Sequence, residues 1–98
     1  MVYKESYEKL RELKPRLRRD LHEYDYLFIR RICWDIERND LPEHIMEEAE
    51  GTSEVFSHIL KDQSITGRTR KSYQQAIKAL KDVYRAAANE LEEENSAA

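Results

Sequence analysis

The chain has 98 residues, a length that fits one small domain. Charged residues make up 38% of it and hydrophobic residues 40%, a balance that excludes a disordered chain; two glycines and two prolines are too few for a sheet of short strands. The formal net charge of −3 argues against a dedicated nucleic-acid-binding protein.

The first predicted helix covers 3–20. Its apolar residues recur at steps of three and four, the period of a helix with one buried face: Tyr3, Tyr7, Leu10, Leu13, Leu17 and Leu21. Pro15 interrupts this pattern. Because a proline inside a helix costs about 3 kcal/mol, we expect a kink or a fresh start there. Residues 1–9 are predicted to form an N-terminal extension of this helix.

The second predicted helix, 23–36, is too apolar for an ordinary surface helix. At 100° per residue, one side of it carries a complete core stripe: Tyr26, Ile29, Ile32, Cys33 and Ile36. Other large apolar side chains lie largely outside that stripe, interrupted by two arginines: Tyr24, Leu27, Phe28 and Trp34. Either these side chains are exposed on the outer side of the helix, or the long N-terminal helix covers them.

The rest of the chain predicts three or four further helices. Pro42 suits a first helical turn, so a short helix is expected over 42–49, ended by Gly51. Thr52 or Ser53 then caps a helix that runs to about residue 62, with an inward set of Val55, Phe56, Ile59 and Leu60. After a loop around Gly67, residues 70–93 form one long helix or two. The acidic segment 92–98 is expected to fray.

Residue patterns that would indicate catalysis or a bound cofactor are missing. His22, His44 and His58 have no metal-ligand spacing to one another or to a cysteine, and Cys33 falls on a core stripe. There is no glycine-rich phosphate loop, no G-x-S-x-G and no H-E-x-x-H motif. The sequence thus predicts a protein that is not an enzyme and has no cofactor, metal or small-molecule substrate.

The expected cell compartment follows from three features that the sequence lacks: a disulfide pair, a membrane span and a signal-peptide core. Cys33 cannot form an internal disulfide, which suits a reducing compartment. No run of about 18 apolar residues could span a membrane, and the segment "MVYKESYEKL" has no signal-peptide core. We expect a cytoplasmic protein with no membrane attachment.

Two basic clusters are candidate contact surfaces. One is "KPRLRR", which includes Arg18 and Arg19; the other is "GRTRK", which includes Arg68, Arg70 and Lys71. Either could contact phosphate groups or an acidic protein. The acidic runs "EEAE" and "ELEEE" supply the opposite charge, which suits head-to-tail association between copies. An ordinary mixed surface would explain the same residues.

From about residue 13 to residue 80, the chain resembles a death effector domain. Its second helix matches that family's spacing of an acid followed by apolar positions, and "ICW" stands where adaptor members carry Leu-Cys-Leu. The stretches "EVFSHILKDQSI" and "RKSYQQAIKAL" resemble the fourth and fifth helices of the family. The family's Arg-x-Asp-Leu motif, which pairs with the acid of the second helix, has no counterpart in the last helix here; "RRDL" precedes the second helix.

The resemblance implies a death-fold-like, all-α, antiparallel bundle of five or six helices. It implies an adaptor function in apoptotic or innate-immune signalling, by homotypic contact with death-fold proteins or by self-association. The outer edge of the second helix would then form an assembly surface. The predicted interaction residues are Tyr24, Leu27, Phe28, Arg31, Arg18, Arg19, Arg68, Arg70 and Lys71. The alternatives are a small helical nucleic-acid-binding or transcription-regulatory domain, which the acidic net charge disfavours, and a bundle designed or selected for stability alone.

Overall fold

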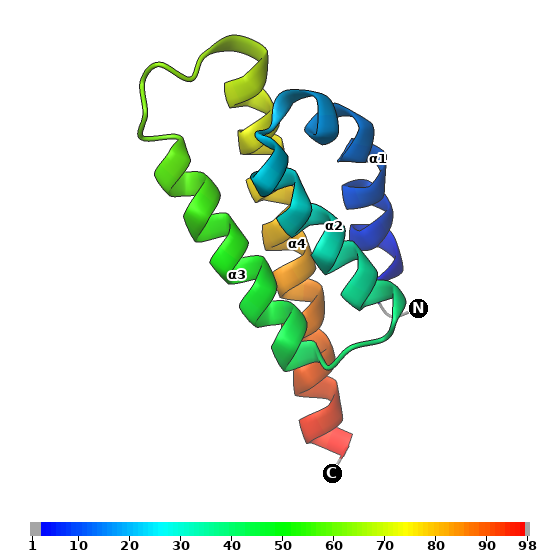
Figure 1. Cartoon of the computed structure of the whole chain (residues 1–98). Coiled ribbons are helices and arrows are strands. Elements are labelled where there is room, and N and C mark those ends of the chain that lie inside the picture. The colour runs from blue at the N-terminus through cyan, green and yellow to red at the C-terminus, as the bar shows by residue number, and fades with distance from the viewer. Residues whose placement is uncertain (1–2, 98) are drawn as a thin grey trace.

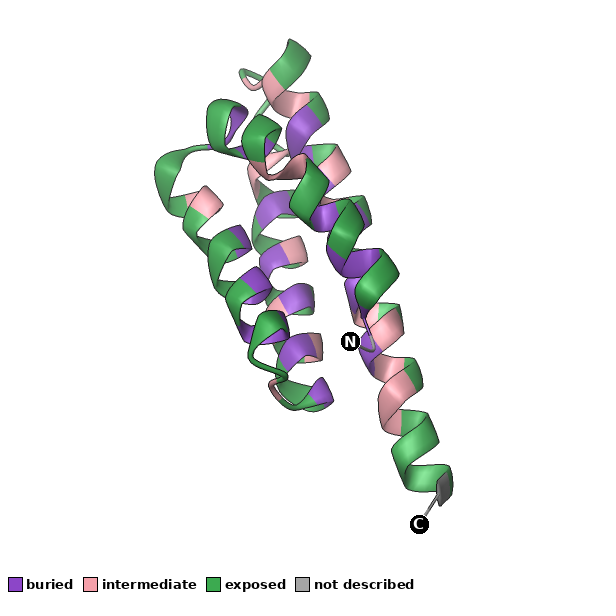
Figure 2. Cartoon of the chain, turned by 90° about the vertical axis from the view of Figure 1, so that its right-hand side faces the viewer, coloured by how far each residue is buried: buried purple, intermediate pink, exposed green. Residues whose placement is uncertain are grey.

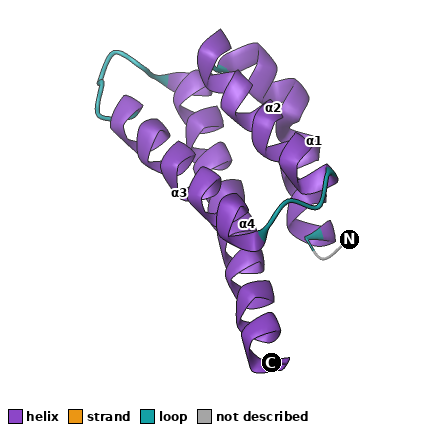
Figure 3. Ribbon diagram, turned by 60° about the horizontal axis from the view of Figure 1, so that its bottom comes forward, coloured by secondary structure: helices purple, strands orange, loops and turns teal. Residues whose placement is uncertain are grey.

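The computed structural model describes residues 3–97, which form four helices and no strand (Figures 1 and 3). The helices are α1 (Lys4–Asp20), α2 (Glu23–Glu37), α3 (Pro42–Ile59) and α4 (Gly67–Ala97). Consecutive helices run in opposite directions, and α4 packs against both α1 and α3. Because α2 bridges α1 and α3 on the remaining side, the four helices enclose one core.

The helix boundaries follow from local chemistry. His22 caps α2, since its Nδ1 atom accepts a hydrogen bond from the backbone N–H of Tyr24 at 3.3 Å. Asn39, with a φ of 56°, reverses the chain after α2. Pro42 occupies the first turn of α3, as predicted. Gly67 begins α4 with a φ of +57°, a left-handed conformation that favours glycine.

The predicted five or six helices are too many, and the error lies at Gly51. This residue does not end a helix; α3 continues through it, and Ile45, Ala49, Thr52 and Phe56 form one buried stripe along its whole length. The burial of that stripe outweighs the cost of a glycine in a helix, about 1 kcal/mol. Residues 70–93 likewise lie in one helix, and α1 continues through Pro15 without a fresh start.

The core lies where the helical periodicity places it. All four helices contribute buried residues, and Figure 2 shows the buried positions on their inward faces. The buried apolar side chains include Leu10 and Leu17 of α1, Ile29, Ile32, Cys33 and Ile36 of α2, Ile45 and Phe56 of α3, and Tyr73, Leu80 and Val83 of α4. Tyr26, expected in the core stripe, is half-buried. Val55 was predicted to face inward and is exposed, because the continuous stripe of α3 passes through Thr52 and Phe56 instead.

The two ends of the chain differ in how they pack. Tyr3 and Tyr7 are buried, so the segment 3–9 is part of the packed structure; residues 1 and 2 lie outside the described residues. The last turns of α4 project beyond the other helices, giving principal dimensions of 49 × 23 × 18 Å (Figure 1). Residues 92–97, where fraying is predicted, lie in the last turns of α4, which ends at Ala97; residue 98 is not described.

Candidate functional site: the outer face of α2 and the basic end of the bundle

The outer face of α2 exposes large apolar side chains. Phe28 is 41% exposed and Trp34 is 61% exposed, and Tyr24 and Leu27 beside them are also open to solvent. Arg31 interrupts the row, and the guanidinium of Arg38 lies 4.9 Å from the centre of the Trp34 ring. We call the residues Tyr24, Leu27, Phe28, Arg31, Trp34 and Arg38 the α2 face. Helix α1 does not cover it, so the covered alternative is wrong.

Exposed apolar residues are confined to one part of the described chain. The six large hydrophobic side chains that are exposed all fall between Tyr24 and Val55: the four on the α2 face, Leu41 in the following loop and Val55 on α3. The exposed positions of α1 are charged residues and Pro15. The apolar surface of the described residues is therefore grouped on α2 and its neighbour α3, as expected for a contact surface rather than for scattered exposure.

A groove of about 360 Å³ lies between α2 and α3 beside the α2 face. Phe28 and Arg31 line it from α2, and Glu48, Gly51 and Val55 line it from α3. Neither side-chain oxygen of Glu48 accepts a hydrogen bond among the described residues, although both are covered. Burial, and then the neighbouring Asp35 carboxyl group, raise the pKa of Glu48 to about 7.

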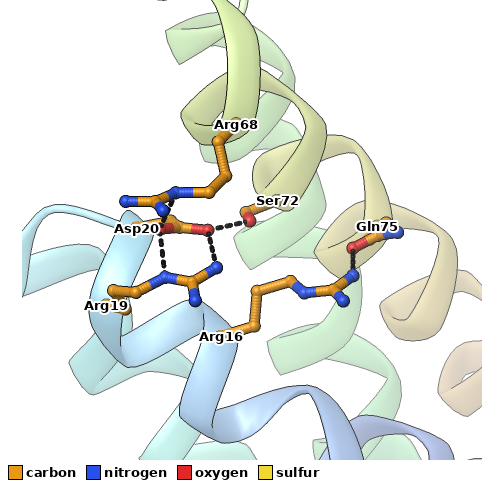
Figure 4. A network of polar contacts seen from close by, with 6 residues as sticks. All are labelled: Arg16, Arg19, Asp20, Arg68, Ser72 and Gln75. Carbon is orange, nitrogen blue, oxygen red and sulfur yellow. Dashed lines mark hydrogen bonds and ion pairs between the residues drawn. The ribbon is translucent and has the colours of Figure 1, made fainter.

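The two predicted basic clusters converge at one end of the bundle, around Asp20 (Figure 4). The side chain of Asp20 is 1% exposed, and it accepts hydrogen bonds from Arg19 at 2.8 and 3.1 Å and from the Ser72 hydroxyl at 2.6 Å. The Nε atom of Arg68 lies 3.1 Å from the same carboxylate. The Arg19 guanidinium, followed by the Ser72 hydroxyl, holds the pKa of Asp20 well below its usual range.

The basic residues differ in whether their side chains have partners within the structure. Arg19 and Arg68 contact Asp20, and Arg70 donates to the backbone carbonyls of Leu60, Asp62 and Ile65, at 2.8, 3.0 and 2.7 Å, thereby closing the loop before α4. Arg18 and Lys71 are exposed at the same end. Arg19, Arg68 and Arg70 thus have partners inside the structure. These contacts explain their presence without an external ligand.

Asp20→Ala is expected to destabilise the bundle, because Asp20 joins the end of α1 to the first turns of α4. The buried Ser72 hydroxyl would lose its acceptor, which alone costs about 1–3 kcal/mol, and two arginines would lose their counter-charge. Urea denaturation at pH 7 measures the effect. In the double variant Asp20→Ala/Ser72→Ala the loss should be smaller than the sum of the single losses; strict additivity would contradict the coupling.

Asp25, the acid of the second helix, has a hydrogen-bond partner that the sequence did not reveal. The Tyr73 hydroxyl of α4 donates a hydrogen bond to Asp25 at 2.6 Å and accepts one from the backbone N–H of His22 at 3.2 Å. Burial, and then the Asp25 carboxylate, raise the pKa of Tyr73 to about 12. This contact fixes the start of α2 against α4, in a chain whose last helix lacks the Arg-x-Asp-Leu motif.

The acidic pair beside the groove was missed because carboxylates on a helical protein are usually solvated. Asp35 lies three residues after Ile32 and one before Ile36, so it falls beside the core stripe of α2; this position was the available signal. Within residues 3–97, no group of three or more histidine, cysteine, aspartate or glutamate side chains could hold a metal ion. None of the described helices is long and apolar enough to cross a membrane.

Comparison with known proteins adds no relative: no protein-family model, no curated protein and no solved structure matches the chain.

Proposed function

We propose that this chain is a homotypic protein-interaction module, not an enzyme, and that it docks through the α2 face onto a second copy of itself. One observation carries the proposal: Tyr24, Leu27, Phe28 and Trp34 are exposed side by side on one helix, together with Arg31 and Arg38. Tyrosine, tryptophan and arginine are the residues most enriched where protein interfaces concentrate their binding energy.

The energy available at this face is of the size needed for weak association. Burying a large apolar side chain stabilises by about 1.5–3 kcal/mol, and four such side chains are partly open to water in the monomer. The sum must offset the loss of rotational and translational freedom on binding, an amount of similar size. A weak, concentration-dependent dimer is the expected result.

Charge complementarity supports a second copy as the partner. Arg31 and Arg38 are exposed on the α2 face, whereas the exposed surface of α3 carries a row of acids at helical spacing: Glu43, Glu47, Glu50 and Glu54. A twofold axis can place α2 of each copy against α3 of the other. The arginines of each copy then pair with the acids of its partner, and the apolar residues meet at the centre.

The resemblance to death effector domains extends the proposal to a class of partner and a setting. We propose that other death-fold proteins can take the place of the second copy, in a cytoplasmic signalling role. Four helices are fewer than the six of that family. This part of the proposal therefore rests on the sequence resemblance and on the α2 face, not on the helix count.

A second candidate, nucleic-acid binding, is favoured by the convergence of the two basic clusters at one end. Arg18 and Lys71 are exposed there, and Arg16 lies nearby, bonded to Gln75 at 2.7 Å (Figure 4). The buried Asp20 offsets part of that charge, and the whole chain is acidic. Retention on DNA or heparin at low salt, lost in Arg18→Glu, would favour this candidate over association through α2.

Phe28→Glu is expected to abolish self-association without unfolding the monomer. The new carboxylate meets water in the monomer but a dry partner surface in the dimer, so the dissociation constant should rise about 10-fold to 150-fold. Sedimentation equilibrium across a concentration series measures it, with circular dichroism as a check on folding.

Gln74→Glu is the matched control, because Gln74 is exposed on α4 and the substitution makes the same change in charge. It should associate like the wild type. The proposal fails if the wild type stays monomeric at every concentration and binds no death-fold protein, or if Phe28→Glu associates as tightly as the wild type.

A further inference from the structure

The groove between α2 and α3 combines apolar walls with charged groups of both signs. Phe28 and Val55 supply apolar side chains, Glu47 and Glu48 supply carboxyl groups, and Arg31 and His44 also line it. Phe28 also belongs to the α2 face, so the groove is continuous with the proposed interface.

The carboxyl group of Glu48 is largely covered and forms one long ion pair among the described residues. The Nε atom of Arg31 lies 3.8 Å from its Oε1 atom, within range of an ion pair but too far for a hydrogen bond. The Arg31 side chain is 72% exposed and therefore free to swing outward. Asp35, also buried, adds a second carboxyl group of the same sign against Glu48.

Gly51 supplies an independent observation. It lies in the interior of α3, where a glycine costs about 1 kcal/mol relative to alanine. A Cβ atom placed on it would have no atom of the chain within 4 Å, and its φ is not one that requires glycine. No contact within the fold therefore requires glycine at residue 51. The glycine keeps the groove open, because any side chain at this position would project into it.

We propose that the groove binds an arginine side chain of the docking protein, with its alkyl chain between Phe28 and Val55 and its guanidinium beside Glu48 in place of Arg31. The claim that the arginine comes from a protein rests on the proposed function. The claim that the groove binds an alkyl guanidinium is independent of that function. Arginine suits the site because its planar, weakly hydrated guanidinium pairs with carboxylates at desolvated interfaces.

The binding is tested with n-butylguanidinium, a small mimic of the arginine side chain, and with N-butylurea, its uncharged isostere. Amide chemical shifts of Gly51 and Val55 are followed by NMR at pH 8, where Glu48 is ionised. n-Butylguanidinium should shift these signals saturably, and N-butylurea should not. At pH 6, where Glu48 holds a proton, binding should weaken; Arg31, Asp35 and His44 are the other charged groups around it.

Three variants make the test specific. Glu48→Gln should weaken binding at least tenfold, and Arg31→Ala should strengthen it by removing the competing cation. Gly51→Leu should abolish binding while leaving the helix intact, since leucine favours helix more than glycine.

The inference is overturned if N-butylurea shifts the same signals equally, if the shifts do not saturate, or if Glu48→Gln binds like the wild type. Its outcome is separate from that of the proposed function. Self-association without n-butylguanidinium binding overturns the groove assignment alone, and n-butylguanidinium binding by a strictly monomeric protein overturns self-association alone.

Discussion

Ile29→Glu is expected to unfold the bundle, while the same substitution at the adjacent Phe28 leaves it folded. Ile29 is 0% exposed and Phe28 is 41% exposed, because the two side chains point 100° apart around α2. At Ile29 the core loses a large aliphatic group, a change that costs about 2–5 kcal/mol. It also receives a carboxyl group with no partner, which adds several kcal/mol.

The total is comparable with the whole stability of a protein of this size. A chain of 98 residues has an unfolding free energy of about 5–15 kcal/mol, so Ile29→Glu should remove most or all of it. Far-UV circular dichroism and urea denaturation measure both variants. Ile29→Val is the control and should cost only about 1 kcal/mol. If Phe28→Glu proves as damaging as Ile29→Glu, the outer side of α2 is structural and cannot be an interface.

Glu48→Gln is expected to stabilise the protein above neutral pH. The pKa of Glu48 is about 7 in the folded protein, against an ordinary value of 4.5. Below pH 4.5 the group is protonated in both the folded and the unfolded state and costs nothing. Between pH 4.5 and 7 the unfolded chain ionises this carboxyl group while the folded protein keeps it protonated, so stability falls across that window by about 2–4 kcal/mol and levels off above pH 7. Glutamine avoids that loss.

Urea denaturation of wild type and Glu48→Gln at several pH values between 5 and 8 measures the effect. The difference in unfolding free energy should be small at pH 5, grow up to about pH 7 and level off toward pH 8. Glu47→Gln is the matched control, since Glu47 is an exposed neighbour on the same helix, and it should follow the wild-type profile. Parallel profiles for wild type and Glu48→Gln would mean that Glu48 is well solvated.

The features that the sequence predicted are those governed by local periodicity. The core stripe of α2 was predicted because Ile29, Ile32 and Ile36 repeat at helical spacing, and their burial confirms it. The same arithmetic placed Phe28 outside the stripe but left open whether α1 covers it, and the structure shows Phe28 exposed. The break at Gly51 was wrong because local propensity, about 1 kcal/mol, competes there with the burial of Phe56, which is larger.

Features that depend on contacts between distant segments could not be predicted. Asp20 and Ser72 are 52 positions apart, and Tyr73 and Asp25 are 48 apart, so no local pattern links them. Asp35 and Glu48 lie on different helices, and only the packing of α2 against α3 turns two ordinary carboxylates into a buried pair. The candidate groove was therefore beyond a reading of the sequence, whereas the α2 face was not.

The uneven packing of the four helices has a consequence for motion. Helices α3 and α4 make the most extensive contact in the bundle, whereas α2 meets α1 and α3 along much smaller seams. Cooperative subunits of a fold open at free energies set by the contacts they must break. We therefore expect α2 to open at a lower free energy than the other three helices. A partner bound to α2 would hold in place the helix that has the least contact with the rest of the bundle. Amide hydrogen exchange would then slow first in α2.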